Sequence, residues 1–313
     1  MNLGIPGVVA VGSNITHKFG KALVGSRSHS ELGHVDRKLG FYMLIGAFIG
    51  VRLAVLVNEM LFHMEGGGHG EGGGSAAGDL YISTLFVVVL SLISASILRD
   101  ALRKDSSGEG PSTKLAEYFG RLNLPPMIYF PVADVTVSLW IVSVVGLATG
   151  YLAGTIGVGG FIGVPAMIYI FGIPTAVAAG TELFLAVFLG AWGAVNYVWA
   201  GFVDLRLVMM LYMGSLIGIH IGVYGTKVIQ ERLIRIVTGV IIILCVISRG
   251  LAIPVYLRKL GMVEMNPNWD VWWNGASTVL LYASGLSGIL VILISVAKAH
   301  HKRRRVHTML TKS

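Results

Sequence analysis

The sequence predicts an all-α membrane protein, a multi-pass helical bundle of two inverted repeats with broken or re-entrant helices. Composition is the first reason, because 54% of the 313 residues are hydrophobic and only 13% are charged. The mean hydropathy of +0.75 is too high for an ordinary soluble protein. An internal repeat and a glycine- and proline-rich interruption of an apolar stretch are the other two reasons. The net charge of +8 resides mostly in loops and the tail, which favours membrane orientation over nucleic-acid binding.

Several apolar stretches are long enough to cross a bilayer, whose hydrocarbon core is about 30 Å thick and needs ~20 helical residues. We expect spans at residues 39–63, 79–98, 137–157, 207–225, 233–248 and 275–297. The single cysteine, Cys245, falls inside one of them, so no intrachain disulfide can form.

Two parts of the chain repeat each other at an offset of 168 residues without gaps. Identical residues occupy 14 of the 48 positions from 4 to 51, mainly at glycine, proline and aspartate. Gly4-Ile5-Pro6 matches Gly172-Ile173-Pro174, and Val35-Asp36 matches Val203-Asp204. Internal duplication of this kind is typical of secondary transporters.

Lysine and arginine predict the orientation, because they are concentrated in cytoplasmic loops. The C-terminal tail should therefore lie in the cytoplasm, since it carries Lys298, Lys302, Arg303, Arg304, Arg305 and Lys312. The loop at 63–79 has neither residue type and should lie outside. Its histidines are surrounded by glycine, which fixes no geometry, so we expect a flexible linker and no metal site. The loop around Asp36 then falls inside and its counterpart around Asp204 outside, so the two repeats are inverted.

These features divide the chain into four parts. Residues 1–98 form the first transmembrane repeat, 99–134 a cytoplasmic connector, 135–250 the second repeat, and 251–313 an extra transmembrane helix with a basic tail. A full span precedes the Gly-Ile-Pro motif of the second copy, whereas the first copy begins almost at its own motif. We therefore expect the first repeat to lack its N-terminal part.

The interruption lies between Gly157 and Glu182, in a segment without charge from Asp134 to Glu182. Irregular backbone survives at membrane depth only where it is buried in protein or lines a watery cavity. We expect a half-helix at 161–171 that enters from outside, turns near the midplane at 172–174, and returns as a helix over 175–200. Glycines that only allow close helix packing are the alternative interpretation.

Free N–H groups at the starts of two half-helices could bind an anion there. The expected contacts are made by Gly157, Gly159, Gly160, Gly180 and Thr181, because glycine lets a small oxyanion approach the backbone. The glycine cluster is not a dinucleotide fingerprint, since no strand precedes it.

A polar stripe follows the first Gly-Ile-Pro motif. Asn14, His17, Lys18 and Lys21 are spaced so that a helix places them on one face. Ionisable residues within a span are candidates for function, and this set suits an anionic substrate. The alternative is that Lys18 and Lys21 extend to the cytoplasmic interface or lie in a loop.

Glu182 occupies the position equivalent to Asn14 and is the only charge between Asp134 and Asp204. We expect it to carry a coupling proton, a role that His17 could share, or to be the counter-ion of Lys18 or Lys21. A salt bridge that only stabilises the fold is the alternative. Arg52 and Glu59 also lie within a span and are interpreted as interhelical partners or interface residues.

The chain resembles the TauE/SafE family of membrane proteins, described as sulfite or organosulfonate exporters. The resemblance rests on Gly157-Val-Gly-Gly-Phe-Ile-Gly-Val-Pro165, on Gly172-Ile-Pro174 with Ala179-Gly180-Thr181, and on Gly33-His-Val-Asp36 with Gly201-Phe-Val-Asp204. It implies an inverted-repeat carrier in the cytoplasmic membrane that moves sulfite, sulfonates or sulfoacetate with the proton gradient. The chain departs from the family pattern in lacking the first copy of the glycine-rich signature and in having Glu182 where a small or polar residue is more usual.

The sequence thus predicts a secondary transporter that exports a small sulfur-containing anion, without cofactor or metal. Its partners are membrane lipid and the anion, with no nucleic acid, and self-association is left open. A carrier for a different anion, an importer, and a non-transporting membrane subunit or inactive fragment are the alternatives. An enzyme is not expected, because no nucleophile–base pair or metal-spaced ligand set is present.

Overall fold

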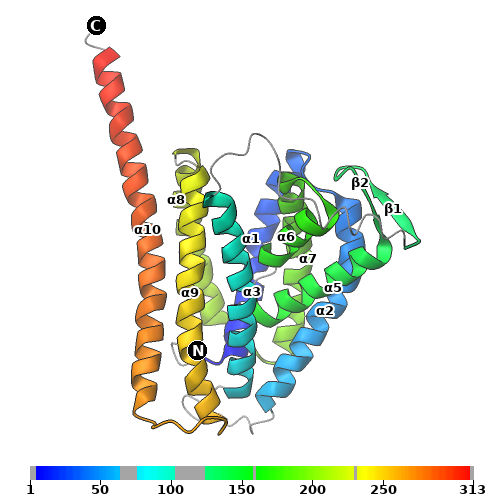
Figure 1. Cartoon of the computed structure of the whole chain (residues 1–313). Helices are drawn as coiled ribbons and strands as arrows, with labels where there is room; N and C mark the ends of the chain where they lie inside the picture. The colour runs from blue at the N-terminus through cyan, green and yellow to red at the C-terminus, as the bar shows by residue number, and fades with distance from the viewer. Residues whose placement is uncertain (1–4, 64–75, 103–123, 158–159, 229–230, 311–313) are drawn as a thin grey trace. The chain divides into compact units, whose positions relative to one another are not determined.

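The computed structural model describes residues 5–63, 76–102, 124–157, 160–228 and 231–310 (Figure 1). Its helices are α1 Gly7–Glu31, α2 Arg37–His63, α3 Ala76–Leu102, α5 Leu139–Ile156, α6 Gly160–Phe171, α7 Thr175–Trp199, α8 Leu205–Val228, α9 Glu231–Lys259 and α10 Trp269–Leu310. Two short antiparallel strands, β1 Met127–Phe130 and β2 Val135–Ser138, form a hairpin.

Six helices within the described residues are long and apolar enough to cross a membrane. They are Arg37–His63, Ala76–Arg99, Leu139–Ile156, Thr175–Trp199, Ile236–Lys259 and Trp269–Ser295. The all-α, multi-pass prediction is therefore confirmed. The expected span at 207–225 falls in α8, whose described side chains end at Gly218. The glycine-rich loop with its histidines at 64–75 and the connector at 103–123 lie outside the described residues, as do the side chains of the basic tail.

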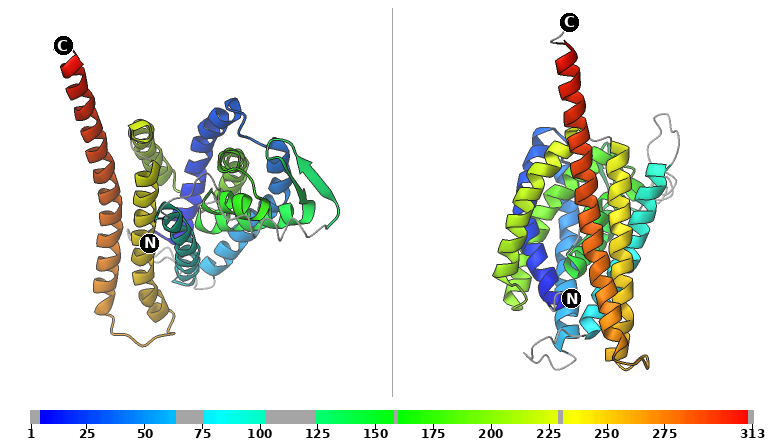
Figure 2. Two further views of the ribbon diagram at one scale, coloured as in Figure 1. Left: turned by 45° about the horizontal axis from the view of Figure 1, so that its top comes forward. Right: turned by 90° about the vertical axis from the view of Figure 1, so that its left-hand side faces the viewer.

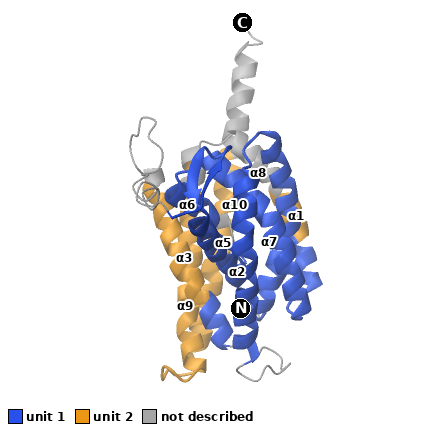
Figure 3. Cartoon of the chain, turned by 90° about the vertical axis from the view of Figure 1, so that its right-hand side faces the viewer, with its two compact units in different colours: residues 1, 3–82, 106–211 blue, residues 2, 83–105, 212–313 orange. Residues whose placement is uncertain are grey.

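The chain forms two compact units (Figure 3). The first contains residues 1, 3–82 and 106–211, and the second contains residues 2, 83–105 and 212–313. All residues of the predicted site belong to the first unit.

The internal repeat is visible in the helix boundaries of the first unit. Helices α1 and α7 both have 25 residues, and their ends are related by the same offset of 168 that relates the sequences. Each begins after a proline in almost the same conformation, with φ −55° and ψ 139° at Pro6 and φ −57° and ψ 140° at Pro174. A glycine with positive φ follows each helix, Gly33 at 72° and Gly201 at 78°. The two sequences therefore fold in the same way locally.

Reciprocal contacts show that α1 and α7 are antiparallel. The backbone N–H of Asp36, just after α1, donates to Thr181 Oγ1 in α7 at 3.0 Å. The backbone N–H of Asp204, just after α7, donates to Ser13 Oγ in α1 at 3.0 Å. Each pair becomes the other when the repeat offset is applied, so the two copies are related by a pseudo-two-fold axis. Such inverted repeats are a common architecture of secondary transporters.

The hairpin is tied to the loop after α1 by one carboxylate. Asp36 is 1% exposed, and its Oδ2 accepts hydrogen bonds from the backbone N–H groups of Val132 and Ala133, each at 3.0 Å. Its Oδ1 accepts from Leu39 N–H at the start of α2, at 2.9 Å. The sequence did not predict this hairpin, which extends across the end of the expected connector. Asp36, which anchors the hairpin, was noted in the sequence only as an aspartate shared by the two repeats.

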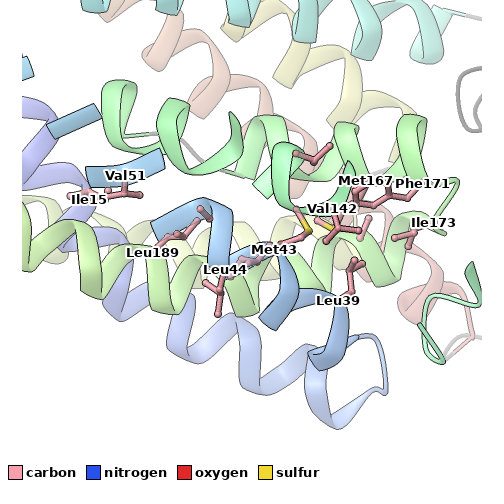
Figure 4. Close-up of a cluster of buried hydrophobic side chains, with 14 of the residues drawn as sticks. Ile15, Leu39, Met43, Leu44, Val51, Val142, Met167, Phe171, Ile173 and Leu189 are labelled. Atoms are coloured by element: carbon pink, nitrogen blue, oxygen red, sulfur yellow. The ribbon is translucent and has the colours of Figure 1, made fainter. Parts of the chain in front are cut away.

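The core of the first unit joins α2, α5, α6 and α7 (Figure 4). Leu39 and Met43 of α2, Val142 of α5 and Met167 of α6 are all fully buried, and Leu189 of α7 is 2% exposed. Large apolar side chains therefore fix the short helix α6 against helices that cross the membrane.

Helices α2 and α5 lie side by side in backbone contact (Figure 1). A Cβ at Gly46 would lie 2.0 Å from Ser143 O, and a Cβ at Gly150 would lie 2.1 Å from Ala47 O. Glycines spaced four apart on both helices permit this approach, as is usual where membrane helices pack through small residues.

Helices α9 and α10 of the second unit are also side by side (Figure 2). Ser248 Oγ donates to Ser277 O at 2.6 Å, and Ser277 Oγ donates to Ser248 O at 2.7 Å. Arg258 pairs with Asp270 near the turn between the helices. Cys245 contacts the hydroxyl of Ser284, which agrees with a thiol that takes part in packing.

The glycine contact predicts a difference between repeat-related positions. Gly46→Ala should destabilise the protein by about 1–3 kcal/mol, because its methyl group has no room beside the backbone of α5. Gly214→Ala, at the equivalent position of α8, is the matched control. There a Cβ would meet no described atom within 4 Å, and alanine favours the helix. Thermal unfolding in detergent should show a loss for the first variant alone, and equal losses would contradict the packing account.

Candidate functional site

The helical chain is interrupted between α5 and α6. Helix α5 ends at Gly157, which has φ of 78° and donates its N–H to Ala153 O at 2.9 Å. A residue with a side chain would be strained in this left-handed conformation, so glycine is required. Helix α6 begins at Gly160, and Gly159 lies outside the described residues. The predicted broken helix is thus present.

The turn at 172–174 separates α6 from α7. Helix α7 has 25 residues and is a candidate span, as is the 18-residue helix α5 that ends before Gly157. The depth of both interruptions in the bilayer, including the expected midplane turn at 172–174, stays a prediction.

Asn14 of α1 closes the end of α5. Its side-chain nitrogen donates to Gly157 O at 3.2 Å. The last carbonyl groups of a helix lack partners within the helix. In this conformation Asn14 therefore satisfies the helix break, and substrate binding by Asn14 stays a prediction.

A second polar group reaches the same helix end, and the sequence analysis missed it. Tyr197 of α7 donates its hydroxyl hydrogen to Gly154 O at 2.7 Å, and Asn58 of α2 donates from Nδ2 to the Tyr197 oxygen at 2.7 Å. Tyr197 is fully buried and Asn58 is 1% exposed. Asn58 and Tyr197 are polar residues within apolar helices, and this was the only signal in the sequence. They lie in different helices, and only the fold brings them together.

The polar stripe of α1 runs from the protein interior to its surface. His17 is buried, Lys18 is partly buried and Lys21 is exposed. Lys21 is close enough to interact electrostatically with both His17 and Lys18. The stripe therefore leads from the exposed Lys21 inward along α1 to the buried His17.

Glu182 of α7 lies at the inner end of this stripe. It is 3% exposed, and neither carboxylate oxygen has a hydrogen-bond partner among the described residues. Lys18 is the residue with which it interacts electrostatically. Burying an ionised carboxylate is very costly unless a cation or proton compensates it. The structure thus brings together two of the predicted residues, Lys18 and Glu182.

Gly163 of α6 makes room for this carboxylate, and the sequence analysis did not select it. A Cβ at Gly163 would lie 1.9 Å from Glu182 Oε2. Gly163 belongs to the first turn of α6, where the helix dipole favours negative charge. The carboxylate of Glu182 therefore occupies a position that suits an anion.

Gly180 and Thr181 contact the other repeat in this conformation. A Cβ at Gly180 would lie 2.3 Å from His34 O, and Thr181 accepts the hydrogen bond from Asp36. Gly12, the repeat equivalent of Gly180, meets Phe202 O at the same distance of 2.3 Å. Gly180 and Thr181 thus lie at contacts between the two repeats, and their role in substrate binding stays a prediction.

Arg52 fits the interpretation as an interhelical partner. Its Nη1 donates to Asn196 Oδ1 in α7 at 3.1 Å. Within the described part of the chain, no group of three histidine, cysteine, aspartate or glutamate residues could hold a metal ion.

Comparison with known proteins identifies a family of transporters. The family model described as sulfite exporter TauE/SafE matches residues 1–249. The probable membrane transporter protein YdhB of Bacillus subtilis (strain 168) is 23% identical over 237 residues, which cover 74% of this chain and 80% of that protein. The probable membrane transporter protein YunE of the same organism is 23% identical over 239 residues, covering 75% and 78% respectively. No solved structure matches the chain.

The contact between Gly163 and Glu182 predicts coupling between the two positions. Gly163→Ala should lower stability by about 1–3 kcal/mol, because the methyl group displaces the carboxylate. In a Glu182→Ala background the same change should cost less, since the obstructing oxygen is gone. The difference should fall in the range of about 0.5–3 kcal/mol found for residues in contact.

The measurement is a double-mutant cycle of thermal unfolding in detergent. Gly285→Ala, where no described atom lies within 4 Å of a Cβ, serves as a control for the glycine substitution itself. Additive losses at positions 163 and 182 would contradict the contact.

Proposed function

The chain belongs to the sulfite exporter TauE/SafE family, and from this premise we propose that it is a secondary transporter that exports a small sulfur-containing anion. Sulfite, a sulfonate or sulfoacetate is the substrate, and the proton gradient is coupled to its movement. The names of the family and of its relatives indicate a multi-pass membrane transporter rather than an enzyme. The observation that carries the proposal is the pair of opposite charges, Lys18 and Glu182, beside a broken helix in an apolar bundle.

The anion is recognised by positive charge and by backbone dipole. Lys18 and Lys21 attract it along α1, and His17 and Asn14 lie on the same stripe. The start of α6 at Gly160 adds N–H groups that have no partner within the helix. Lysine binds oxyanions as a point charge, so this site suits small anions of varied shape.

Alternating access follows from the paired repeats. The Ser13–Asp204 and Thr181–Asp36 contacts are equivalent, and each lies at one end of the antiparallel pair α1 and α7. Two such ends can open in turn by similar movements of the two repeats around a site between them. The binding residues of α1 and α7 would then face alternate sides of the membrane.

We propose the cytoplasmic membrane as the location, with the C-terminus inside, because lysine and arginine accumulate in the tail. Membrane lipid and the anion are the proposed partners. Self-association is compatible with this arrangement and is tested by cross-linking in the membrane.

The proposal predicts flux through purified protein. Proteoliposomes should move radiolabelled sulfite and methanesulfonate, and Lys18→Gln or Lys21→Gln should reduce the flux about 10- to 100-fold, the loss expected for one charged hydrogen bond. Arg27→Gln is the matched control, because Arg27 lies on the same helix but pairs with Glu31 at the surface. Its flux should stay within about twofold of the wild type. Absence of flux for both anions in the wild-type protein would contradict transport of small sulfur-containing anions and favour a carrier for a different anion or a non-transporting subunit.

A further inference from the structure

We propose that Glu182 is a built-in anion that neutralises Lys18 in the empty carrier, and that substrate replaces it only when Glu182 takes up a proton. The carrier then moves one proton together with each monovalent anion, in the same direction and without net charge. This inference rests on the proposed transport function and specifies its coupling.

The position of Glu182 supports its role as a substitute for substrate. The carboxylate is buried, has no hydrogen-bond partner among the described residues, and lies against Gly163 in the first turn of α6. That turn favours negative charge, and Lys18 is the cation that interacts with it. A small oxyanion needs these two attractions, a cation and a helix start. The carboxylate of Glu182 lies where both could act on it.

Two buried carboxylates lie in this region, Asp36 and Glu182. Asp36 accepts three backbone hydrogen bonds, whereas Glu182 has none among the described residues. Helices α5 and α6 contain no charged residue, and Glu182 is the only one in α7. On α1, Lys18 interacts with Glu182, Lys21 lies farther out, and His17 is next to Lys18. His29 of α1 packs near Gly180 and against the ring of His34. From α2, Arg52 is bonded to Asn196.

Charge balance then links proton and anion. With Glu182 ionised and Lys18 protonated, the net charge of the pair is zero. An anion added to this pair leaves one negative charge in a low-dielectric site, and a proton added alone to a Glu182 oxygen leaves one positive charge, so each step alone is unfavourable. Adding both restores neutrality. Proton and anion therefore promote each other's binding, as linkage requires.

Cotransport has a consequence for direction. Because proton and anion move the same way, export proceeds when the outward gradient of the anion exceeds the inward gradient of protons. An anion produced inside the cell meets this condition once its concentration ratio across the membrane exceeds that of protons. The direction is thus set by the gradients, while the stoichiometry is set by Lys18 and Glu182.

The test measures how far methanesulfonate accumulates in proteoliposomes. This anion keeps a single negative charge across the pH range, so any pH effect belongs to the protein. In the wild type, the ratio of internal to external methanesulfonate should change up to about tenfold for each unit of pH difference across the membrane. It should be insensitive to a potassium diffusion potential. In Glu182→Gln it should ignore the pH gradient and follow the potential instead. A potential of about 100 mV biases one uncompensated charge about 50-fold.

Two controls separate Glu182 from other titratable groups. Glu59→Gln makes the same chemical change in α2, and His29→Gln removes a histidine outside the stripe that packs near Gly180, so both should behave as the wild type. The inference is overturned if methanesulfonate accumulation by the wild type follows the membrane potential. It is also overturned if His29→Gln loses pH-driven accumulation. Either outcome leaves transport established. Should Glu182→Gln fail to fold, the wild-type ratio of protons to methanesulfonate, followed with an internal pH dye, decides alone. One proton per anion supports the coupling, and zero overturns it. Absence of any wild-type flux instead refutes the proposed function itself.

Discussion

Helix α5 ends at Gly157 in a left-handed conformation, and the last carbonyl groups of the helix have no partner within it. Much of the first unit is arranged around this constraint. Asn14 reaches Gly157 O from α1, and Tyr197 reaches Gly154 O from α7. Two other helices thus supply hydrogen-bond donors to the end of α5. Helix α7 also places Glu182 against Gly163 of α6.

The two repeats share a scaffold but differ in chemistry at their equivalent sites. Asn14 and Glu182 are related by the repeat offset, yet the amide satisfies a helix end and the carboxylate lies against a helix start. These requirements are opposite in sign, because carbonyl groups need a donor and the first turn of a helix favours an acceptor. A symmetric backbone therefore accommodates an asymmetric charge distribution.

Much of the fold followed from the sequence because the repeat constrains it locally. The offset of 168 also relates the ends of α1 and α7, and their proline starts and glycine ends are readable without any long-range contact. The site was less predictable. Spacing on one helix placed Lys18 on the correct face, but Gly163, Tyr197 and Asn58 act through contacts across helices. The midplane turn stays a prediction, because proline and glycine mark a helix end without indicating its depth in the bilayer.

The clamp at Asp36 makes the hairpin an external indicator of movement in the membrane. One buried carboxylate fixes the β1–β2 turn to the loop after α1, and Lys38 adds a hydrogen bond to Tyr129 O. Tyr129 itself is 51% exposed. A spin label or fluorophore on that strand would thus follow displacements of α1 from the aqueous side. Spectroscopists could observe the working cycle without altering any residue buried in the bilayer.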